Sequence, residues 1–179
     1  MANPMCIDSR LGNSETYLTR DVPDWIRRNL QVNADPRAWA VGGYSSGGTC
    51  ALQLALRRPD LFPTFLDIAG QVEPTLGNRH KTVDRAFGGD SAKFVPLTPL
   101  DMLARMKFPV TAGRIYDGAG DRASVAEQQV ILAACRRNGI DVQFSVVRGA
   151  HNWYAWTRAF ERALPWLAVR QGIDRHQLS

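Results

Sequence analysis

A serine between two glycines is the side chain in this sequence best suited to nucleophilic chemistry. Gly43-Tyr44-Ser45-Ser46-Gly47 follows the apolar run 39–41 and precedes the helix-forming run 49–56. A G-x-S-x-G pattern between a strand and a helix is typical of a nucleophile elbow, a tight turn that exposes the serine hydroxyl. The alternative is a glycine-rich loop with Ser45 at its tip. Because the strand, the Gly-Gly step and the helix former are all present, we expect the elbow.

A nucleophilic serine needs a base, and His151 is the best candidate among the three histidines. Apolar residues alternate from 142 to 146 and predict a strand, and His151 follows in the next loop, before a helix. Neutral imidazole can accept the hydroxyl proton and later return it. His80 lies in a polar stretch and His176 in the C-terminal tail, so neither competes. A surface role is the alternative for His151, but the order serine, acid, histidine favours catalysis.

Two aspartates could orient the imidazole. Asp117 and Asp121 both follow a predicted strand at 110–116, where the carboxyl end of the strand would place them near the serine. We prefer Asp121, because Gly118-Ala119-Gly120 gives the loop freedom to turn. Asp117 remains the alternative acid, although it could instead accept backbone amides in the glycine-rich turn.

Strands alternate with helices along the chain, which predicts an α/β fold with a parallel sheet of about four strands and flanking helices. Strands are expected at 38–44, 64–69, 110–116 and 141–147, and helices at 14–30, 46–57, 123–138 and 153–167. Pro23 should kink or restart the first helix. The apolar stripes that we expect on the last two helices consist of Val125, Gln129, Leu132 and Cys135, and of Trp153, Trp156, Phe160, Leu164 and Leu167. We expect one domain over 1–179, with its core at 14–170.

Residues 71–107 are rich in proline and glycine and predict an irregular cap that overhangs the nucleophile. Tyr44, Trp153 and Trp156 are candidates for the substrate pocket. A row of tryptophans at helical spacing is more often part of a core, which is the alternative for Trp153 and Trp156.

Composition excludes several classes of protein. The net charge of +5 comes from arginine pairs dispersed along the 179 residues, and no basic run with interleaved aromatics is present, so we expect no nucleic-acid partner. No apolar stretch approaches the roughly 20 residues of a membrane-spanning helix. Cys6, Cys50 and Cys135 are too few and too far apart for a zinc site. We expect no metal and no organic cofactor.

Four segments together resemble the putative-esterase branch of the α/β-hydrolases, which includes esterase D, feruloyl and enterochelin esterases and the secreted mycolyltransferases of actinobacteria. The segments are Tyr17-Leu18-Thr19 through Asp24-Trp25, Gly43 to Gly48, Pro59-Asp60-Leu61-Phe62, and Gly149-Ala150-His151-Asn152-Trp153 with Trp156. The resemblance runs from about residue 17 to residue 167. Its Gly-x-x-Asp turn matches Gly118 to Asp121 and supports Asp121 as the acid.

The resemblance implies a three-layer α/β-hydrolase-like fold and a serine hydrolase that cleaves small-molecule carboxylic esters through Ser45, His151 and Asp121. Only about 40 residues precede Ser45, so we expect the N-terminal strands of such domains to be missing. Ser46 would then supply one oxyanion donor, and the second would come from the missing segment. We therefore expect weak activity or none from the chain alone. Two alternatives are acyl transfer to a sugar or lipid hydroxyl and a non-catalytic module.

Three further expectations depend on this resemblance. The strand at 38–44 would become an apolar sheet edge, available for self-association. Many relatives of this branch are exported, and in an exported protein Cys6 and Cys50 could form a disulfide. The chain shows no signal-peptide pattern, so both an extracytoplasmic and a cytoplasmic location stay open.

Overall fold

A parallel sheet forms the centre of the protein, as predicted. The computed structural model describes residues 3–173. The strands are β3 (Ala40–Tyr44), β4 (Thr64–Ile68), β5 (Ala112–Gly118) and β6 (Asp141–Val147), paired in the spatial order β3-β4-β5-β6. Strands that are neighbours in this sheet therefore also follow one another along the chain. The carboxyl ends of all four strands meet at one edge, where the loops of the candidate site begin.

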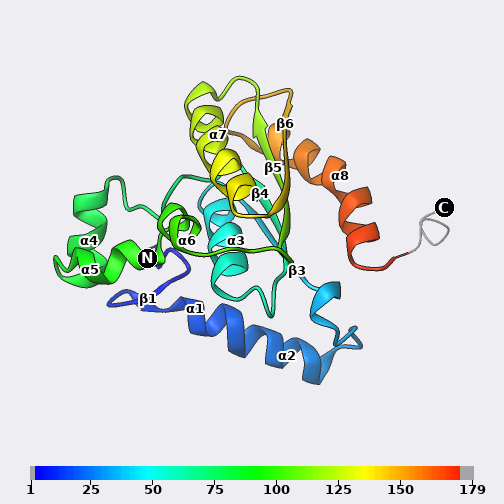
Figure 1. Ribbon diagram of the computed structural model, residues 1–179, viewed down its shortest axis with the longest axis horizontal. Coiled ribbons are helices and arrows are strands. Elements are labelled where there is room, and N and C mark those ends of the chain that lie inside the picture. Colours follow the sequence, from blue (N-terminus) through cyan, green and yellow to red (C-terminus); the bar gives the residue numbers. More distant parts are fainter. Residues whose placement is uncertain (1–2, 174–179) are drawn as a thin grey trace.

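Helices cover both faces of this sheet (Figure 1). On one face, α3 (Ser46–Arg57) packs against β3 and β4, α7 (Arg122–Arg137) packs against β5 and β6, and α6 (Pro99–Arg105) contacts both helices. On the other face, α8 (Trp153–Arg170) packs against β4, β5 and β6. The result is the expected three-layer α/β arrangement.

The N-terminal region lies beside the sheet. It consists of β1 (Asp8–Ser9), β2 (Gly12–Asn13), α1 (Ser14–Thr16), the π-helical turn η1 (Tyr17–Asp21), α2 (Val22–Asn29) and the 3₁₀ turn η2 (Pro36–Ala38). The β1–β2 hairpin has no clear sequence signal and was not expected. Pro23 lies in the first turn of α2, which begins directly after the π-helical turn η1, so the α-helix restarts at the proline while the helical run continues. Cys6 and Cys50 form a disulfide that joins this region to α3.

The segment 71–107 is more regular than its composition suggests. It contains α4 (Arg79–Phe87), α5 (Ser91–Phe94), the 3₁₀ turn η3 (Val95–Leu97) and α6. Phe94 and Leu103 are buried, and Leu103 belongs to the same core cluster as β4 and α7. The expectation of an irregular segment outside the core was therefore wrong for α6. Proline at the start of η3 and α6 begins these helices instead of breaking them.

The apolar stripe expected on α8 packs on the sheet only in part: Trp156 and Leu167 lie against the core cluster, but alanines form the centre of the packing face. Ala155, Ala159 and Ala163 are fully buried against Ile68, Tyr116 and Val147. Trp153, Phe160 and Leu164 of the expected stripe are 65%, 50% and 45% exposed. The alanines recur at every fourth residue and let the helix approach the strands closely, which the larger side chains would prevent.

The buried face of α7 is also shifted from the expected one. Leu132 and Cys135 are buried as predicted, but Gln129 is exposed and Gln128 is fully buried. A glutamine is an unusual core residue, and its polar partners are described with the site. In the sequence, these partners could not be recognised because they come from distant segments.

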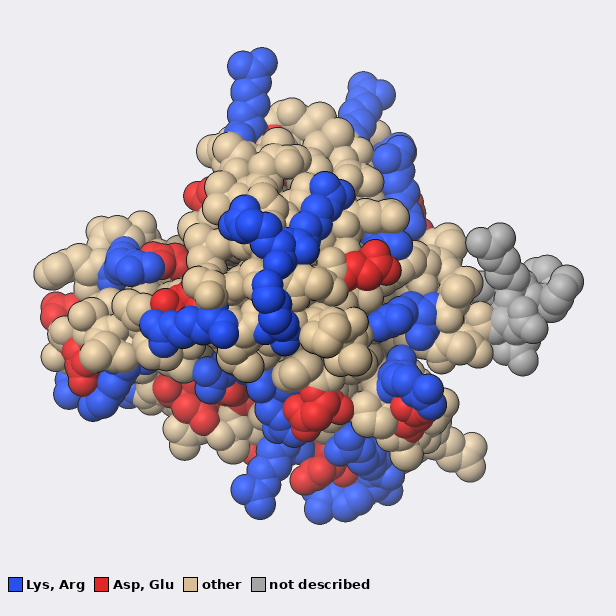
Figure 2. All heavy atoms as spheres, in the orientation of Figure 1, with Lys and Arg blue, Asp and Glu red and all other residues tan. Residues whose placement is uncertain are grey.

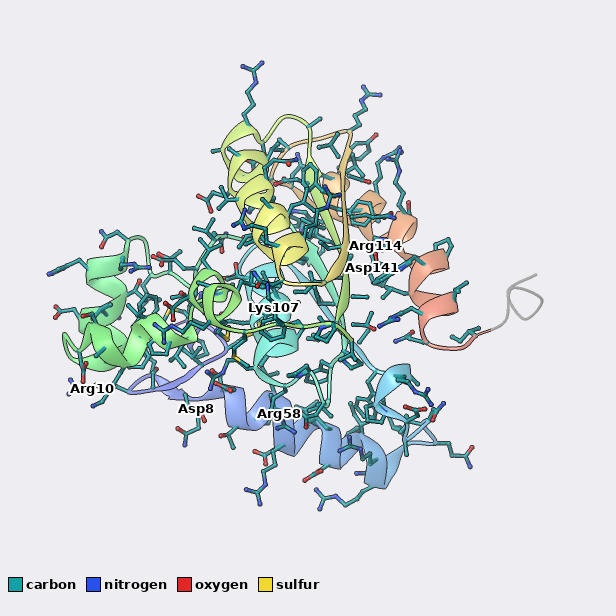
Figure 3. The ribbon with its side chains drawn as sticks, in the orientation of Figure 1. Asp8, Arg10, Arg58, Lys107, Arg114 and Asp141 are labelled. Carbon is teal, nitrogen blue, oxygen red and sulfur yellow. A yellow bond between two sulfur atoms is a disulfide. The ribbon has the colours of Figure 1, made fainter. Side chains whose placement is uncertain are left out.

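Charged side chains are spread over the visible surface, with acidic residues among the basic ones (Figure 2). Arg114 lies on β5 (Figure 3). Its guanidinium carbon is 4.2 Å from the centre of the Trp166 ring of α8. Within residues 3–173, no helix is long and apolar enough to cross a bilayer.

Candidate active site

Ser45 lies in a strained turn between β3 and α3. Its φ of 54° and ψ of −127° are unfavourable for a residue with a side chain. The turn is held by the Ser45 amide, which donates to the Ile68 carbonyl at 2.7 Å, and by the Gly48 amide, which donates to the Ser45 carbonyl at 2.8 Å. A Cβ on Gly43 would lie 2.5 Å from the Gly47 carbonyl oxygen, so the strand and the helix can meet only if residue 43 is glycine.

The three residues expected to act together are in hydrogen-bond contact. His151 Nε2 lies 2.9 Å from Ser45 Oγ, and His151 Nδ1 lies 2.8 Å from Asp121 Oδ2. The side chain of His151 is 39% exposed and that of Asp121 is 18% exposed. The imidazole thus connects the serine hydroxyl to a carboxylate and remains open to solvent on one side.

Two interlocked loops bring the imidazole and the carboxylate together. The Gly120 amide donates to the Gly149 carbonyl at 2.8 Å, and Ala119 donates to Val147 at 2.8 Å. A Cβ on Gly118 would lie 2.6 Å from the Ala150 carbonyl oxygen, so the close approach needs glycine there. Because these loops follow the adjacent strands β5 and β6, their backbone contacts fix where His151 lies relative to Asp121.

Each loop ends in a helix cap. Asp121 Oδ1 accepts the Ser124 amide at the start of α7 at 3.3 Å, while its Oδ2 faces His151. Asn152 Oδ1 accepts the Ala155 amide at the start of α8 at 3.1 Å. One carboxylate therefore both caps a helix and contacts the imidazole, which restricts its rotation. Sequence reasoning missed the Asn152 cap, for which an asparagine before the helix was the available signal.

Asp117 has a different environment from Asp121. Its carboxylate is completely buried, and its Oδ1 accepts the Gly118 amide at 2.7 Å. Burial raises the pKa of Asp117 above its ordinary value, although the hydrogen bond from Gly118 lowers it. The structure therefore places the Asp121 carboxylate against His151, and Asp117 in the backbone-accepting position that was its alternative.

An aromatic wall lies beside the imidazole. The Trp156 ring meets the His151 ring edge-on, with 5.2 Å between the ring centres, and stacks on the Tyr44 ring with 3.9 Å between the centres. The Trp153 ring meets Tyr44 edge-on, with 4.7 Å between the centres. Tyr44, Trp153 and Trp156 line a largely apolar groove of about 570 Å³ between β3 and α8. All three pocket candidates are thus brought together next to the Ser45–His151 pair.

A buried carboxylate below the elbow has no counterpart among the predicted site residues. Asp67 of β4 is completely buried, and its Oδ1 accepts the Gly70 amide at 2.9 Å and the Gln128 side-chain amide at 3.2 Å. Burial raises the pKa of Asp67 to about 7, and the hydrogen bonds from Gln128 and Gly70 oppose that rise. The available signal was an aspartate in the middle of an otherwise apolar strand.

Comparison with known proteins agrees with this architecture. An uncharacterised protein of Corynebacterium glutamicum is 37% identical over 178 residues, which cover 96% of this chain and 42% of that protein. A diacylglycerol acyltransferase/mycolyltransferase of Mycobacterium avium is 38% identical over 63 residues, which cover 35% of this chain and 17% of that protein.

Among solved structures, an S-formylglutathione hydrolase from Agrobacterium tumefaciens superposes with a TM-score of 0.80 at 19% identity, over 94% of this chain and 63% of that one. The chain thus spans less than two thirds of each of these relatives. The family model described as Putative esterase matches residues 8–167. The chain therefore belongs to the Putative esterase family.

Proposed function

We propose that the chain carries the catalytic residues of a serine hydrolase that cleaves small-molecule carboxylic esters. The observation that supports this most strongly is the unbroken contact from Ser45 Oγ through His151 to Asp121, at 2.9 Å and 2.8 Å. Membership of the Putative esterase family supports the same class of reaction.

In the proposed mechanism, the neutral His151 imidazole donates from Nδ1 to Asp121 and accepts the Ser45 hydroxyl proton at Nε2. Ser45 Oγ then attacks the ester carbonyl carbon, and the Ser46 amide at the start of α3 donates to the developing oxyanion. Collapse of the tetrahedral intermediate breaks the carbon–alkoxide bond, and His151 protonates the leaving alcohol. A water molecule, deprotonated by His151, releases the acyl group and restores the Ser45 hydroxyl.

A fluorophosphonate probe tests this proposal, because it reacts with an activated serine and needs no knowledge of the substrate. We expect one adduct on Ser45, located by peptide mass spectrometry, and none on the matched variant Ser45→Ala. The neighbouring variant Ser46→Ala keeps the backbone amide and should still be labelled. A folded wild-type chain that is not labelled would contradict the enzyme and support the non-catalytic module.

The identity of the acid can be tested with two isosteric variants. Asp121→Asn should lower the labelling rate by about 10⁴-fold, because the imidazole then adopts the wrong tautomer. Asp117→Asn should retain most of the rate, since its carboxylate contacts the Gly118 amide and not His151. The reverse pattern would assign the role to Asp117.

Acyl transfer is the second candidate, and the similarity to the M. avium acyltransferase favours it. The two reactions differ only in whether water or another hydroxyl attacks the acyl-enzyme. Product analysis with a sugar or a diacylglycerol as competing acceptor separates them: a transferred acyl group indicates a transferase, and the free acid alone indicates a hydrolase.

We further propose that Tyr44, Trp153 and Trp156 form one wall of the substrate pocket. Trp153 is 65% exposed and lines the groove between β3 and α8, where Trp156 contacts the His151 ring, so Trp153 is available to a ligand. If an apolar part of the ester lies there, Trp153→Ala should raise KM and leave kcat nearly unchanged. A KM that does not move for aryl and long-chain alkyl esters would place the pocket elsewhere.

Self-association is proposed at the same side of the molecule. Among the described strands, β3 pairs only with β4, so its other edge is open, and Phe160 beside it is 50% exposed. We expect the mass in sedimentation equilibrium to rise with concentration, and Phe160→Lys to reduce that rise. Val110→Lys, at a residue 64% exposed and outside the groove, is the control. A wild-type mass that stays monomeric would contradict this proposal.

A further inference from the structure

The loop after β4 is hydrogen-bonded to the two helices that begin directly after Ser45 and Asp121. This loop, residues 69–72, is called the bridging loop below. It begins at Ala69, a buried non-glycine residue with a φ of 52°, and the Ala69 amide donates to the Tyr116 carbonyl at 2.8 Å. The preceding carbonyl, that of Ile68, accepts the Ser45 amide at 2.7 Å. The strained turn at Ser45 is therefore hydrogen-bonded to the residue before a second strained turn, at Ala69.

On the side of Ser45, the bridging loop forms hydrogen bonds with α3. The Gln71 amide donates to Thr49 Oγ1 at 2.7 Å, and the Thr49 hydroxyl is 3.0 Å from Gln71 Oε1. A Cβ on Gly70 would lie 2.6 Å from the Thr49 amide nitrogen, so the loop backbone lies directly against the first turns of this helix. Since Ser45 immediately precedes α3, movement of the loop would be transmitted to the serine.

On the side of Asp121, the bridging loop forms hydrogen bonds with α7. Gln128 Nε2 donates to the Gly70 carbonyl at 2.8 Å, and the Val72 amide donates to Glu127 Oε2 at 3.1 Å. Gln128 lies two turns into the helix that Asp121 caps. A shift of the loop relative to α7 would therefore change the distance from Asp121 to the elbow.

The buried carboxylate of Asp67 connects the bridging loop with both helices. Its Oδ1 accepts the Gly70 amide at 2.9 Å, and both carboxylate oxygens lie 3.2 Å from Gln128 Nε2. The same Oδ1 would be 2.3 Å from a Cβ on Gly48, so the carboxylate also contacts the first turn of α3. One buried group thus touches β4, the bridging loop, α3 and α7.

From this geometry we propose that Gln128 and Asp67 are positioning residues, which act through the bridging loop to hold Ser45 and Asp121 at hydrogen-bond distance from the two ring nitrogens of His151. The inference rests on the proposed function, because it assigns these residues to the same reaction. A displacement of about 1 Å at a reacting group can cost about a hundredfold in rate. A network that fixes two helix starts relative to one another therefore controls kcat without touching the substrate.

The test compares Gln128→Met with Gln53→Met. Methionine has a similar size and removes the amide, so Gln128→Met loses the bonds to Gly70 and Asp67. Gln53 on α3 is also completely buried, and its amide has no hydrogen-bond partner among the described residues, which makes it the matched control. We expect kcat on an aryl ester and the fluorophosphonate labelling rate to fall about tenfold to a hundredfold for Gln128→Met, with KM unchanged. For Gln53→Met we expect neither to fall.

Asp67→Leu is the second variant, because leucine has a similar shape but no oxygen to accept the Gly70 and Gln128 amides. Its kcat should fall in the same way as that of Gln128→Met. Urea unfolding shows whether each variant is folded under assay conditions. Folded Gln128→Met and Asp67→Leu chains with wild-type kcat and labelling rate would overturn the inference.

Amide hydrogen exchange separates a failure of this inference from a failure of the proposed function. The Ser45 amide bonds to Ile68 whether or not the serine is reactive. Measured by NMR and compared with amides in the centre of β5, exchange at Ser45 should become at least about tenfold faster in Gln128→Met than in Gln53→Met. Unchanged exchange would overturn the positioning role even if the wild-type chain proves to be an esterase.

Discussion

At the scale of single residues, Gly43 and Gly47 flank Ser45 but have different steric surroundings. A Cβ on Gly43 would collide with the Gly47 backbone at 2.5 Å, whereas a Cβ on Gly47 meets nothing within 4 Å. The fold therefore requires glycine at position 43, whereas packing does not require glycine at position 47.

We expect Gly43→Ala to destabilise the protein by about 1–3 kcal/mol, because the strand or the helix must shift to make room. Gly47→Ala should leave stability unchanged or slightly higher, since alanine is the better helix former. Urea unfolding of both variants measures the difference. Equal losses for the two variants would contradict the steric account.

Asp67 should make the protein less stable as the pH rises, which is the opposite of the usual effect of a carboxylate. Burial raises its folded-state pKa to about 7, well above the ordinary value of an aspartate, so the folded protein binds the proton more tightly than the unfolded chain. The cost of ionising Asp67 is absent below about pH 4, grows as the pH rises, and is complete above about pH 7.

Asp67→Asn removes this cost, because asparagine does not titrate. Relative to the wild type, the variant should therefore gain stability between pH 4 and pH 7, by at most about 4 kcal/mol for a pKa difference of this size. Urea unfolding at a series of pH values measures the gain. A stability difference that is the same at every pH would show that Asp67 keeps an ordinary pKa.

At the scale of secondary structure elements, α8 shows why the apolar pattern misled. Its largest side chains were expected to face the core, yet Ala155, Ala159 and Ala163 do so. The sequence contains both stripes. Only the distance between helix and sheet, which depends on β4, β5 and β6, determines which stripe fits.

Ala159→Leu should therefore destabilise the protein by about 1–3 kcal/mol, since the added atoms have no space between α8 and the sheet. The control is Leu164→Ala on the exposed side, where the side chain is 45% exposed and its loss should cost about 0.5 kcal/mol or less. Urea unfolding compares the two. A larger loss for Leu164→Ala would mean that the aromatic stripe is the packing face.

The Cys6–Cys50 disulfide ties the N-terminal region to the helix that follows Ser45. It closes a loop with a sequence separation of 44, for which chain entropy predicts a stabilisation of about 4 kcal/mol. Reduction should lower the free energy of unfolding by this order. Cys135 is free, so a thiol reagent applied to the unfolded, unreduced chain should find one thiol, and three after reduction. Three thiols without reductant would contradict the bond.

At the scale of the whole molecule, the sequence was sufficient for the parallel sheet and its order of elements. Periodic apolar runs and glycine-rich turns are local signals, and β3, β4, β5 and β6 each have one. The sequence was insufficient for α6 and the β1–β2 hairpin, whose formation depends on contacts between distant segments. For the same reason Ser45, His151 and Asp121 could be named from motifs, whereas the bonds among Asp67, Gln128 and the bridging loop could not.

The strand order also has a consequence for biosynthesis. Because β3, β4, β5 and β6 are added to the sheet in the order in which the ribosome makes them, the hydroxyl of Ser45 emerges first and the imidazole of His151 follows 106 residues later. Until β6 has docked and α8 has begun, the nascent chain holds a serine without its base. Ser45 should therefore stay unreactive during this part of translation, and its reactivity should appear only after the segment through the start of α8 has left the exit tunnel.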